Sequence, residues 1–182
     1  VAALTLNIFH THADRVKMAN IAQIANVLQA MWLTNDDKLI LTPTYYVFMM
    51  YAPHKDAVAI PLSISEGSIV ATEGERPYPA LSATASRAAD GTVTISLVNT
   101  LLDASREVTI PLPEGLAGGT QKADKKWSIV SAEILTAPEA NAHNTFEAPE
   151  TVASQQFTGA KIKSGALTLT MPPLSILSIT LR

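Results

Sequence analysis

The chain lacks cysteine altogether: none occurs among its 182 residues. A disulfide scaffold, a thiolate nucleophile and a cysteine-based metal site are therefore excluded. Without disulfides to indicate an oxidising compartment, the sequence leaves the cytoplasm, the periplasm and the extracellular space equally open.

The chain also lacks basic clusters and long apolar runs. Lys and Arg number 13 against 16 Asp and Glu, which gives a net charge of −3. The densest charged stretches, residues 122–126 and 36–38, are typical of solvated turns. Because binding to a nucleic-acid backbone requires a clustered positive face, we expect no nucleic-acid partner. No apolar run approaches the roughly 18–20 residues of a membrane helix, and no signal peptide is visible, so no membrane partner is expected.

The remaining composition is that of a globular protein with a substantial core, because 47% of the residues are apolar and 16% are charged. A length of 182 residues suits one domain, or one domain with part of another. The first residue, Val1, already stands in an apolar pattern with Leu4 and Ile8, whereas domain boundaries usually begin in polar residues. We expect the chain to be part of a longer protein.

Up to about residue 56 the apolar period is helical. Val1, Leu4, Ile8 and Phe9 would mark one face of a first helix that stops near His12. Thr42 followed by Pro43 predicts a helix start, with threonine as the N-cap and proline at the first helical position. This helix would run through YYVFMMYAPH and end before Pro53.

Between these helices lies the stretch VKMANIAQIANVLQAMWLTND, which is apolar on nearly every side. The 3.6-residue spacing from Met18 to Trp32 favours a helix. The start of the stretch, VKMANIA, could equally be a short buried strand, because periodicity cannot separate the two for so short a run.

After Lys55 the sequence alternates with period two. Short segments rich in Val, Ile and Thr are separated by Gly, Pro or Asn: AVAIPLSI, ALSATASR, GTVTISLVN, REVTIPL, KWSIVSAEILT, GALTLTM and SILSITLR. The alternation predicts inward side chains at Val93, Ile95, Leu97, Val108, Ile110 and Leu112, and water-facing ones at Thr92, Thr94, Ser96 and Thr109. Asp90–Gly91 is a strong hairpin signal. The sequence thus predicts a mainly β chain, an antiparallel β-sandwich preceded by a helical fragment.

Few residues suggest metal or anion chemistry. His10 and His12 could bind a metal from a strand, but on a helix two such positions point about 200° apart. Because no third ligand of matching context is apparent, hydrogen bonding is favoured and no metal or cofactor is expected. Asp14–Arg15, beside Lys17, could contact an anion, although an ion pair at a helix end is the simpler interpretation.

A glycosidase-type site needs two carboxylates that flank the sugar. All of the candidates fall in predicted turns, linkers or strand edges, without the apolar setting that raises the pKa of a catalytic acid: Glu66, Glu73, Glu75, Glu107, Glu114, Glu133, Glu139, Glu147 and Glu150. No Gly-x-Ser-x-Gly elbow and no Gly-rich phosphate loop occurs. The sequence itself therefore offers no catalytic residue.

Two groups of side chains could bind a sugar. Trp127, Tyr78 and Phe146 could form a stacking platform, although with only 5% aromatic residues a tryptophan in an alternating strand is more often part of a core. Gln23 and Asn26 are amides in an apolar segment, where an unpaired amide costs about 1–3 kcal/mol. They are either satisfied by the backbone or face a polar cleft that binds ligand hydroxyls.

A family resemblance bears on these alternatives. HADRVKMANIAQIANVLQAMWLT and LTPTYYVFMMYAPHKDA resemble the end of the catalytic domain of family 51 α-L-arabinofuranosidases. AHNTFEAPETV and LTLTMPPLSILSITLR resemble the end of the sandwich domain of the same enzymes. The resemblance is strong over residues 1–62, moderate over about 120–182 and weak between them.

The resemblance implies the C-terminal remnant of a (β/α)₈ barrel (residues 1–56) followed by a jelly-roll-type β-sandwich (residues 57–182). The remnant would comprise a helix at Val1–His10, the eighth strand at Val16–Ala19 and the last helix at Thr42–Ala52. Substrate sites in such barrels lie at the C-terminal ends of the strands, which places Gln23 as a substrate contact. Asn26 would bind substrate or brace the loop.

The same resemblance implies a function for the parent protein, the hydrolysis of terminal α-L-arabinofuranosyl groups of arabinan or arabinoxylan with retention. The two catalytic glutamates of the family precede Val1 and match no residue here, so the chain alone is predicted to be inactive. The resembled enzymes commonly form homo-oligomers, so self-assembly is also implied. The rival hypothesis is a non-catalytic carbohydrate-binding or scaffold module, which exposed coplanar rings at Trp127 and Tyr78 would favour.

Overall fold

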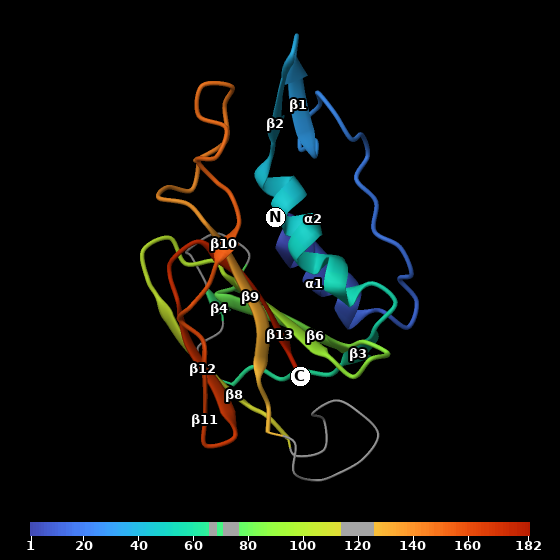
Figure 1. Ribbon diagram of the computed structural model, residues 1–182, viewed down its shortest axis with the longest axis vertical. Helices are drawn as coiled ribbons and strands as arrows, with labels where there is room; N and C mark the ends of the chain where they lie inside the picture. Colours follow the sequence, from blue (N-terminus) through green and yellow to red (C-terminus); the bar gives the residue numbers. More distant parts are fainter. Residues whose placement is uncertain (66–68, 71–76, 114–125) are drawn as a thin grey trace.

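A computed structural model describes residues 1–65, 69–70, 77–113 and 126–182. Within these residues, two helices and a short 3₁₀ turn occupy the first third, and strands dominate the rest (Figure 1). The helices are α1 (Ala2–Thr11) and α2 (Pro43–Tyr51), with the turn η1 (Ala52–His54) directly after α2. Neither helix has the length and apolarity that crossing a bilayer requires.

The largest sheet has six antiparallel strands in the order β10-β9-β13-β7-β6-β3. Its centre is the pairing of the final strand with β7 on one side and β9 on the other. The strands are β3 (Val58–Ile60), β6 (Leu81–Arg87), β7 (Val93–Asn99), β9 (Ile129–Thr136), β10 (Gln155–Gln156) and β13 (Ser175–Leu181).

A second sheet has three antiparallel strands in the order β11-β12-β8. They are β8 (Arg106–Pro111), β11 (Lys161–Lys163) and β12 (Ala166–Met171). Two separate pairs of strands complete the described part of the chain. One is the hairpin of β1 (Trp32–Asn35) and β2 (Lys38–Leu41), and the other is the antiparallel pair of β4 (Ile69–Val70) and β5 (Tyr78–Pro79).

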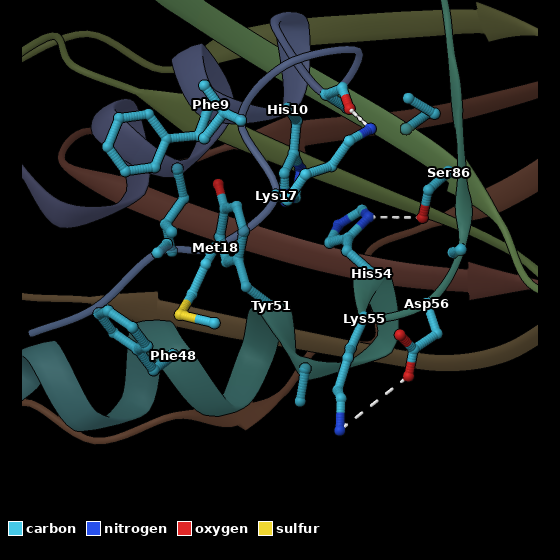
Figure 2. A pocket seen from close by; sticks show the side chains of 18 residues that line it. Phe9, His10, Lys17, Met18, Phe48, Tyr51, His54, Lys55, Asp56 and Ser86 are labelled. Carbon is cyan, nitrogen blue, oxygen red and sulfur yellow. Dashed lines mark hydrogen bonds and ion pairs between the residues drawn. The ribbon is translucent and has the colours of Figure 1, made fainter.

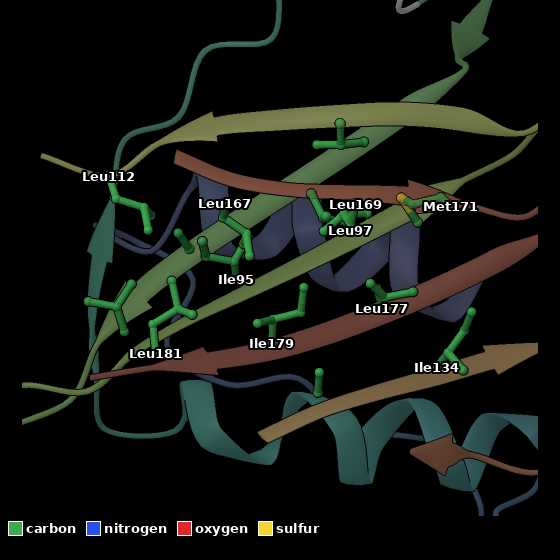
Figure 3. Close-up of a cluster of buried hydrophobic side chains, with 14 residues drawn as sticks. Ile95, Leu97, Leu112, Ile134, Leu167, Leu169, Met171, Leu177, Ile179 and Leu181 are labelled. Atoms are coloured by element: carbon green, nitrogen blue, oxygen red, sulfur yellow. The ribbon is translucent and has the colours of Figure 1, made fainter. Parts of the chain in front are cut away.

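The two larger sheets face each other across an apolar core (Figure 3). Leu97, Leu177 and Ile179 of the six-stranded sheet meet Leu167 and Met171 of the three-stranded sheet, and all five are almost completely buried. Burial of such side chains stabilises the fold by roughly 1.5–3 kcal/mol each. The prediction of a mainly β chain with antiparallel sheets is therefore confirmed.

The other face of the six-stranded sheet is covered by the helices, so the chain forms three layers (Figure 1). Helix α1 packs on β6 and β7, and helix α2 packs on β9 and β13. The expectation that Thr94 and Ser96 face water is consequently wrong, because they are 3% and 0% exposed beneath the helices. Alternation identified the two faces of β7 correctly, but it could not show that both faces are covered.

Helix α1 ends at Thr11, close to the expected His12, and the predicted apolar face is buried only in part, because Leu4 and Phe9 pack against the apolar cluster beneath the helices. Ala3, Leu6 and Asn7 are buried, whereas Val1 and Ile8 are 92% and 58% exposed. Since apolar residues occur on almost every side of this helix, periodicity could not select the buried face. The buried Asn7 is bonded within the fold, where its amide donates to the Ser82 hydroxyl at 2.9 Å.

Helix α2 begins as predicted. The Thr42 hydroxyl accepts a hydrogen bond from the Tyr45 backbone N–H at 3.4 Å, and Pro43 takes the first helical position. The Asp90–Gly91 hairpin also forms between β6 and β7. Gly91 has φ of 85°, and the Asp90 carboxylate accepts from both the backbone N–H and the hydroxyl of Thr92.

The segment between the helices is neither the predicted helix from Met18 to Trp32 nor the predicted strand at Val16–Ala19. Residues 16–31 contain no helix, and their one β contact is an isolated bridge between Ala25 and Trp32. Met18 and Leu28 are 74% and 93% exposed. A strand gains its hydrogen bonds from a neighbouring strand, and the described part of the chain pairs no strand with residues 16–19.

Candidate functional site

Gln23 and Asn26 lie in this irregular segment and have different surroundings. Gln23 is exposed, and its side-chain amide has no hydrogen-bond partner among the described residues. The Asn26 amide donates to the Thr34 hydroxyl at 2.8 Å, and its oxygen accepts from the Thr34 backbone N–H at 2.7 Å. Asn26 therefore braces the segment against β1, while the Gln23 amide stays available to a ligand.

Asn26 is also one of the residues that shape the backbone here. Its φ of 57° lies in the left-handed region, which asparagine tolerates better than most residues. Its backbone N–H donates to the Trp32 carbonyl at 3.2 Å, and the Met31 N–H donates to Ile24 at 2.9 Å. These bonds form a compact loop just after Gln23.

A second polar site lies between the helices and the six-stranded sheet, beside a cavity of about 640 Å³ (Figure 2). The 7%-exposed ring of His54 is held by two strands at once. Its Nδ1 lies 2.7 Å from the Ser86 hydroxyl of β6, and its Nε2 lies 2.9 Å from the Ser96 hydroxyl of β7. In a neutral ring one of these nitrogens donates and the other accepts.

His10 and Tyr51 complete this polar cluster. The His10 ring centroid lies 4.7 Å from that of His54, and its Nδ1 lies 3.2 Å from the Thr84 hydroxyl. The Tyr51 hydroxyl donates to Asn7 Oδ1 at 2.7 Å, which joins α2 to α1. We call His10, Tyr51 and His54 the interlayer cluster.

Burial governs the ionisation of the interlayer cluster. Loss of solvent, together with the smaller effect of the adjacent His10, lowers the pKa of His54 to about 4. Burial also lowers the pKa of His10 and raises the pKa of Tyr51 far above its ordinary value. All three groups are therefore uncharged at neutral pH, which is the form that a low-dielectric site favours.

The other predicted candidates are scattered. On α1, His10 faces the sheet, while His12 lies 3.3 Å from Arg15 through its ring nitrogen. Among the described residues, no three His, Asp or Glu side chains form a group that could hold a metal ion. Arg15 contacts His12 rather than its neighbour Asp14, so the predicted ion pair does not form.

The described glutamates are all exposed, in agreement with their interpretation as surface charges: Glu107, Glu133, Glu139, Glu147 and Glu150. Glu66, Glu73, Glu75 and Glu114 lie outside the described residues. Trp127 packs partly buried against the inter-sheet core and donates to the Pro113 carbonyl at 3.3 Å, whereas Tyr78 is exposed. This arrangement favours a structural role for Trp127 over a sugar-stacking platform.

The sequence interpretation missed the interlayer cluster. Asn7 and His10 stand three residues apart on a mostly apolar helix, which indicates that one helix face meets polar groups. Their partners, Tyr51 and His54, likewise follow the apolar run YYVFMM. Only the fold shows that the serine and threonine hydroxyls of β6 and β7 lie opposite them.

Comparison with known proteins gives consistent results. Residues 1–175 match the family described as the α-L-arabinofuranosidase C-terminal domain. An intracellular exo-α-L-arabinofuranosidase of Bacteroides ovatus is 43% identical over 182 residues, which are 100% of this chain and 33% of that protein. An exo-α-(1→6)-L-arabinofuranosidase of Bifidobacterium longum is 28% identical over 90% of this chain and 30% of its own length.

Solved structures agree with these relatives. The GH51 arabinofuranosidase of Xanthomonas axonopodis pv. citri superposes with a TM-score of 0.87 and 40% identity, over 100% of this chain and 34% of that one. The arabinose complex of the Thermotoga maritima α-L-arabinofuranosidase gives a TM-score of 0.78 and 27% identity, over 98% and 36%. The chain spans about one third of the length of the curated relatives that it matches.

Proposed function

Because this chain belongs to the α-L-arabinofuranosidase C-terminal domain family, we propose that it is the C-terminal part of a retaining exo-α-L-arabinofuranosidase. The observation that carries the proposal is its 43% identity, over its whole length, to a relative with that exo-activity in its name. The parent would release terminal α-L-arabinofuranosyl groups from arabinan- or arabinoxylan-type glycans through a covalent glycosyl-enzyme. Its two catalytic glutamates would lie outside these residues, so the chain alone would be inactive.

We propose that residues 1–56 are the last helix-strand-helix of the (β/α)₈ barrel of the parent and that residues 57–182 are its jelly-roll-type sandwich. The exposure of Met18, Ile24 and Leu28 supports this division, since apolar side chains so exposed mark a surface that another part of the protein covers. Residues 16–19 would become the eighth strand only when neighbouring barrel strands supply their hydrogen bonds.

Gln23 is proposed as a substrate contact in the complete enzyme. Its amide is exposed and unpaired among the described residues, so both its donor and acceptor are free for the hydroxyls of an arabinofuranosyl unit. Asn26 would support this contact, because its own amide is already bonded to Thr34. A hydrogen bond made only to the bound sugar in the transition state raises kcat/KM without stabilising the free protein.

The proposal also covers the oligomeric state and the location of the parent enzyme. Assembly as a homo-oligomer would cover apolar surface in the complete enzyme, and light scattering on the complete protein would test it. An intracellular location is proposed on the same basis as the activity, since the Bacteroides ovatus relative is named as an intracellular enzyme.

A chimera tests the proposed function. Residues 1–182 would replace the matching third of the Bacteroides ovatus relative, and release of arabinose from an aryl α-L-arabinofuranoside would be measured. We expect activity within about tenfold of the intact relative. A tenfold loss corresponds to about 1.36 kcal/mol of transition-state stabilisation. A chimera that unfolds cooperatively in urea but releases no arabinose would overturn the proposal.

The same chimera tests Gln23. Gln23→Ala should lower kcat/KM at least tenfold while leaving the urea midpoint unchanged. The matched control is Gln156→Ala, because Gln156 is an exposed glutamine on β10, the short edge strand of the six-stranded sheet. Equal kcat/KM values for the two variants would remove Gln23 from the substrate site.

A further inference from the structure

The helical layer is attached to the six-stranded sheet partly through groups that can gain a proton. His54 bonds to Ser86 and Ser96 on adjacent strands, and the ring of His10 lies 4.7 Å away with its own bond to Thr84. The inter-sheet core on the opposite face of the same sheet contains none of the four histidines of the chain. Titration of His10 and His54 therefore acts at the helix-facing interface of the sheet and not within the inter-sheet core.

Protonation would not simply break the hydrogen bonds of His54. A serine hydroxyl can either donate or accept, so both ring N–H groups of an imidazolium could still find oxygen atoms. The cost comes instead from placing a charge in a buried site. A second charge on His10, with ring centroids 4.7 Å apart, would add direct repulsion.

The surroundings of His54 provide little compensation for such a charge. The strands facing it, β6 and β7, offer only hydroxyl groups, and α2 offers the neutral phenol of Tyr51. Of the described residues that line the adjoining cavity, Asp56 is the only acidic one, and it is exposed and lies 4.0 Å from the Lys55 ammonium. The other charged and titratable groups at the cavity are Lys17, Lys55 and His10.

The cavity also gives the cluster access to solvent. It is about 640 Å³ in volume and is lined by His10, Tyr51 and His54 (Figure 2). Water and protons can thus approach the rings while the sheets remain packed. A local separation of the layers can relieve the buried charge without global unfolding.

We propose that His54, with His10 beside it, is an acid-released latch whose protonation detaches α1 and α2 from the six-stranded sheet while the inter-sheet core stays folded. This inference concerns residues within the chain and does not depend on the proposed enzymatic activity. The direction follows from linkage. The latched state holds His54 neutral, so the latch is fully effective above about pH 6.5 and weakens progressively as the pH falls toward 4.

Amide hydrogen exchange, corrected for the intrinsic exchange rate at each pH, tests the latch on the 182-residue chain. With a pKa of about 4 in the latched state and 6.5 in the open state, the opening equilibrium of α1 and α2 should rise about 30-fold between pH 7.5 and pH 5. Protection of β12 in the inter-sheet core should stay within about threefold over this range.

His54→Gln removes the titrating ring and should reduce the rise to below tenfold. The matched control, His143→Gln, replaces an exposed histidine that contacts only the Asn141 carbonyl, and it should retain the full rise. A rise of equal size in His54→Gln, or an equal loss of protection in β12, would overturn the proposal.

If His54→Gln fails to fold, the wild-type chain decides the matter. The ¹H NMR signal of His54 Cε1–H should titrate together with the loss of protection in α1 and α2. A protonated His54 in a chain whose helices keep their full protection would refute the latch.

Discussion

Removal of a single oxygen atom, in Tyr51→Phe, tests how the helices are joined above the sheet. Tyr51 is 6% exposed, and its hydroxyl donates to Asn7 Oδ1 at 2.7 Å and lies 3.3 Å from the Ala3 carbonyl. Phenylalanine keeps the ring and leaves Asn7 Oδ1 without its short bond. A buried polar atom left unpaired costs about 1–3 kcal/mol.

We expect the lower half of this range, about 1–2 kcal/mol, because Tyr51 borders the cavity and water can approach the vacated position. For a chain of this size the loss corresponds to a decrease in Tm of roughly 2–8 °C. Urea unfolding followed by circular dichroism measures the free energy directly, and the slope with denaturant should be unchanged because the fold is the same.

Two comparisons make this test decisive. Tyr78→Phe removes a hydroxyl from a tyrosine that is 38% exposed, and it should change stability by less than about 0.5 kcal/mol. A double-mutant cycle of Tyr51→Phe with Asn7→Ala should show a coupling of at least about 0.5 kcal/mol. If Tyr51→Phe changes stability as little as Tyr78→Phe, or if the cycle shows no coupling, the hydrogen bond between Tyr51 and Asn7 does not join the two helices.

Three further substitutions probe the other layers. Leu177→Ala, at a fully buried position between the sheets, should lower the free energy of unfolding in urea by about 2–5 kcal/mol. The control Leu102→Ala, at a 65%-exposed position, should lower it by less than about 0.5 kcal/mol, and similar losses in the two variants would contradict the assigned core. Asn99→Ala removes an amide that donates to two carbonyl groups, and should lower stability by about 1–3 kcal/mol in thermal unfolding, whereas an unchanged Tm would count against this bond network. Thr42→Ala removes the N-cap of α2 and the 2.6 Å hydrogen bond from the Thr42 hydroxyl to the Ala30 carbonyl, so it should lower stability by about 1 kcal/mol and speed amide exchange in β1 and β2. Unaltered exchange would show that Thr42 does not hold β1 and β2 in place.

The sequence predicted the strands well because their signal is local. A period of two, bounded by turn residues, identified β6, β7, β8, β12 and β13 and the hairpin at Asp90–Gly91. The short strands, such as β10 with two residues, have no room for a period. Alternation could not predict the burial of the polar face, because it does not show that helices cover Thr94 and Ser96.

The segment after Arg15 shows the opposite limit. Its composition suits a buried element, yet residues 16–31 form neither helix nor strand in this chain. An apolar run adopts regular structure when neighbouring helices or strands cover it. The apolar composition of this run indicates that it needs such neighbours, but it does not identify them. Gln23 and Asn26 could be proposed as candidates because amides in an apolar run stand out, and their role stays a prediction. His54 was missed because its hydroxyl partners come from strands more than thirty residues away.

The measurement that tests the central claim most directly is the release of arabinose by the purified 182-residue chain from an aryl α-L-arabinofuranoside. We propose that this chain supplies a substrate contact and that the catalytic carboxylates lie in another part of the enzyme. Release by the chain alone should therefore be no faster than in buffer, at a chain concentration where the chimera with the Bacteroides ovatus relative is active. Release above that background by the chain alone would contradict the account.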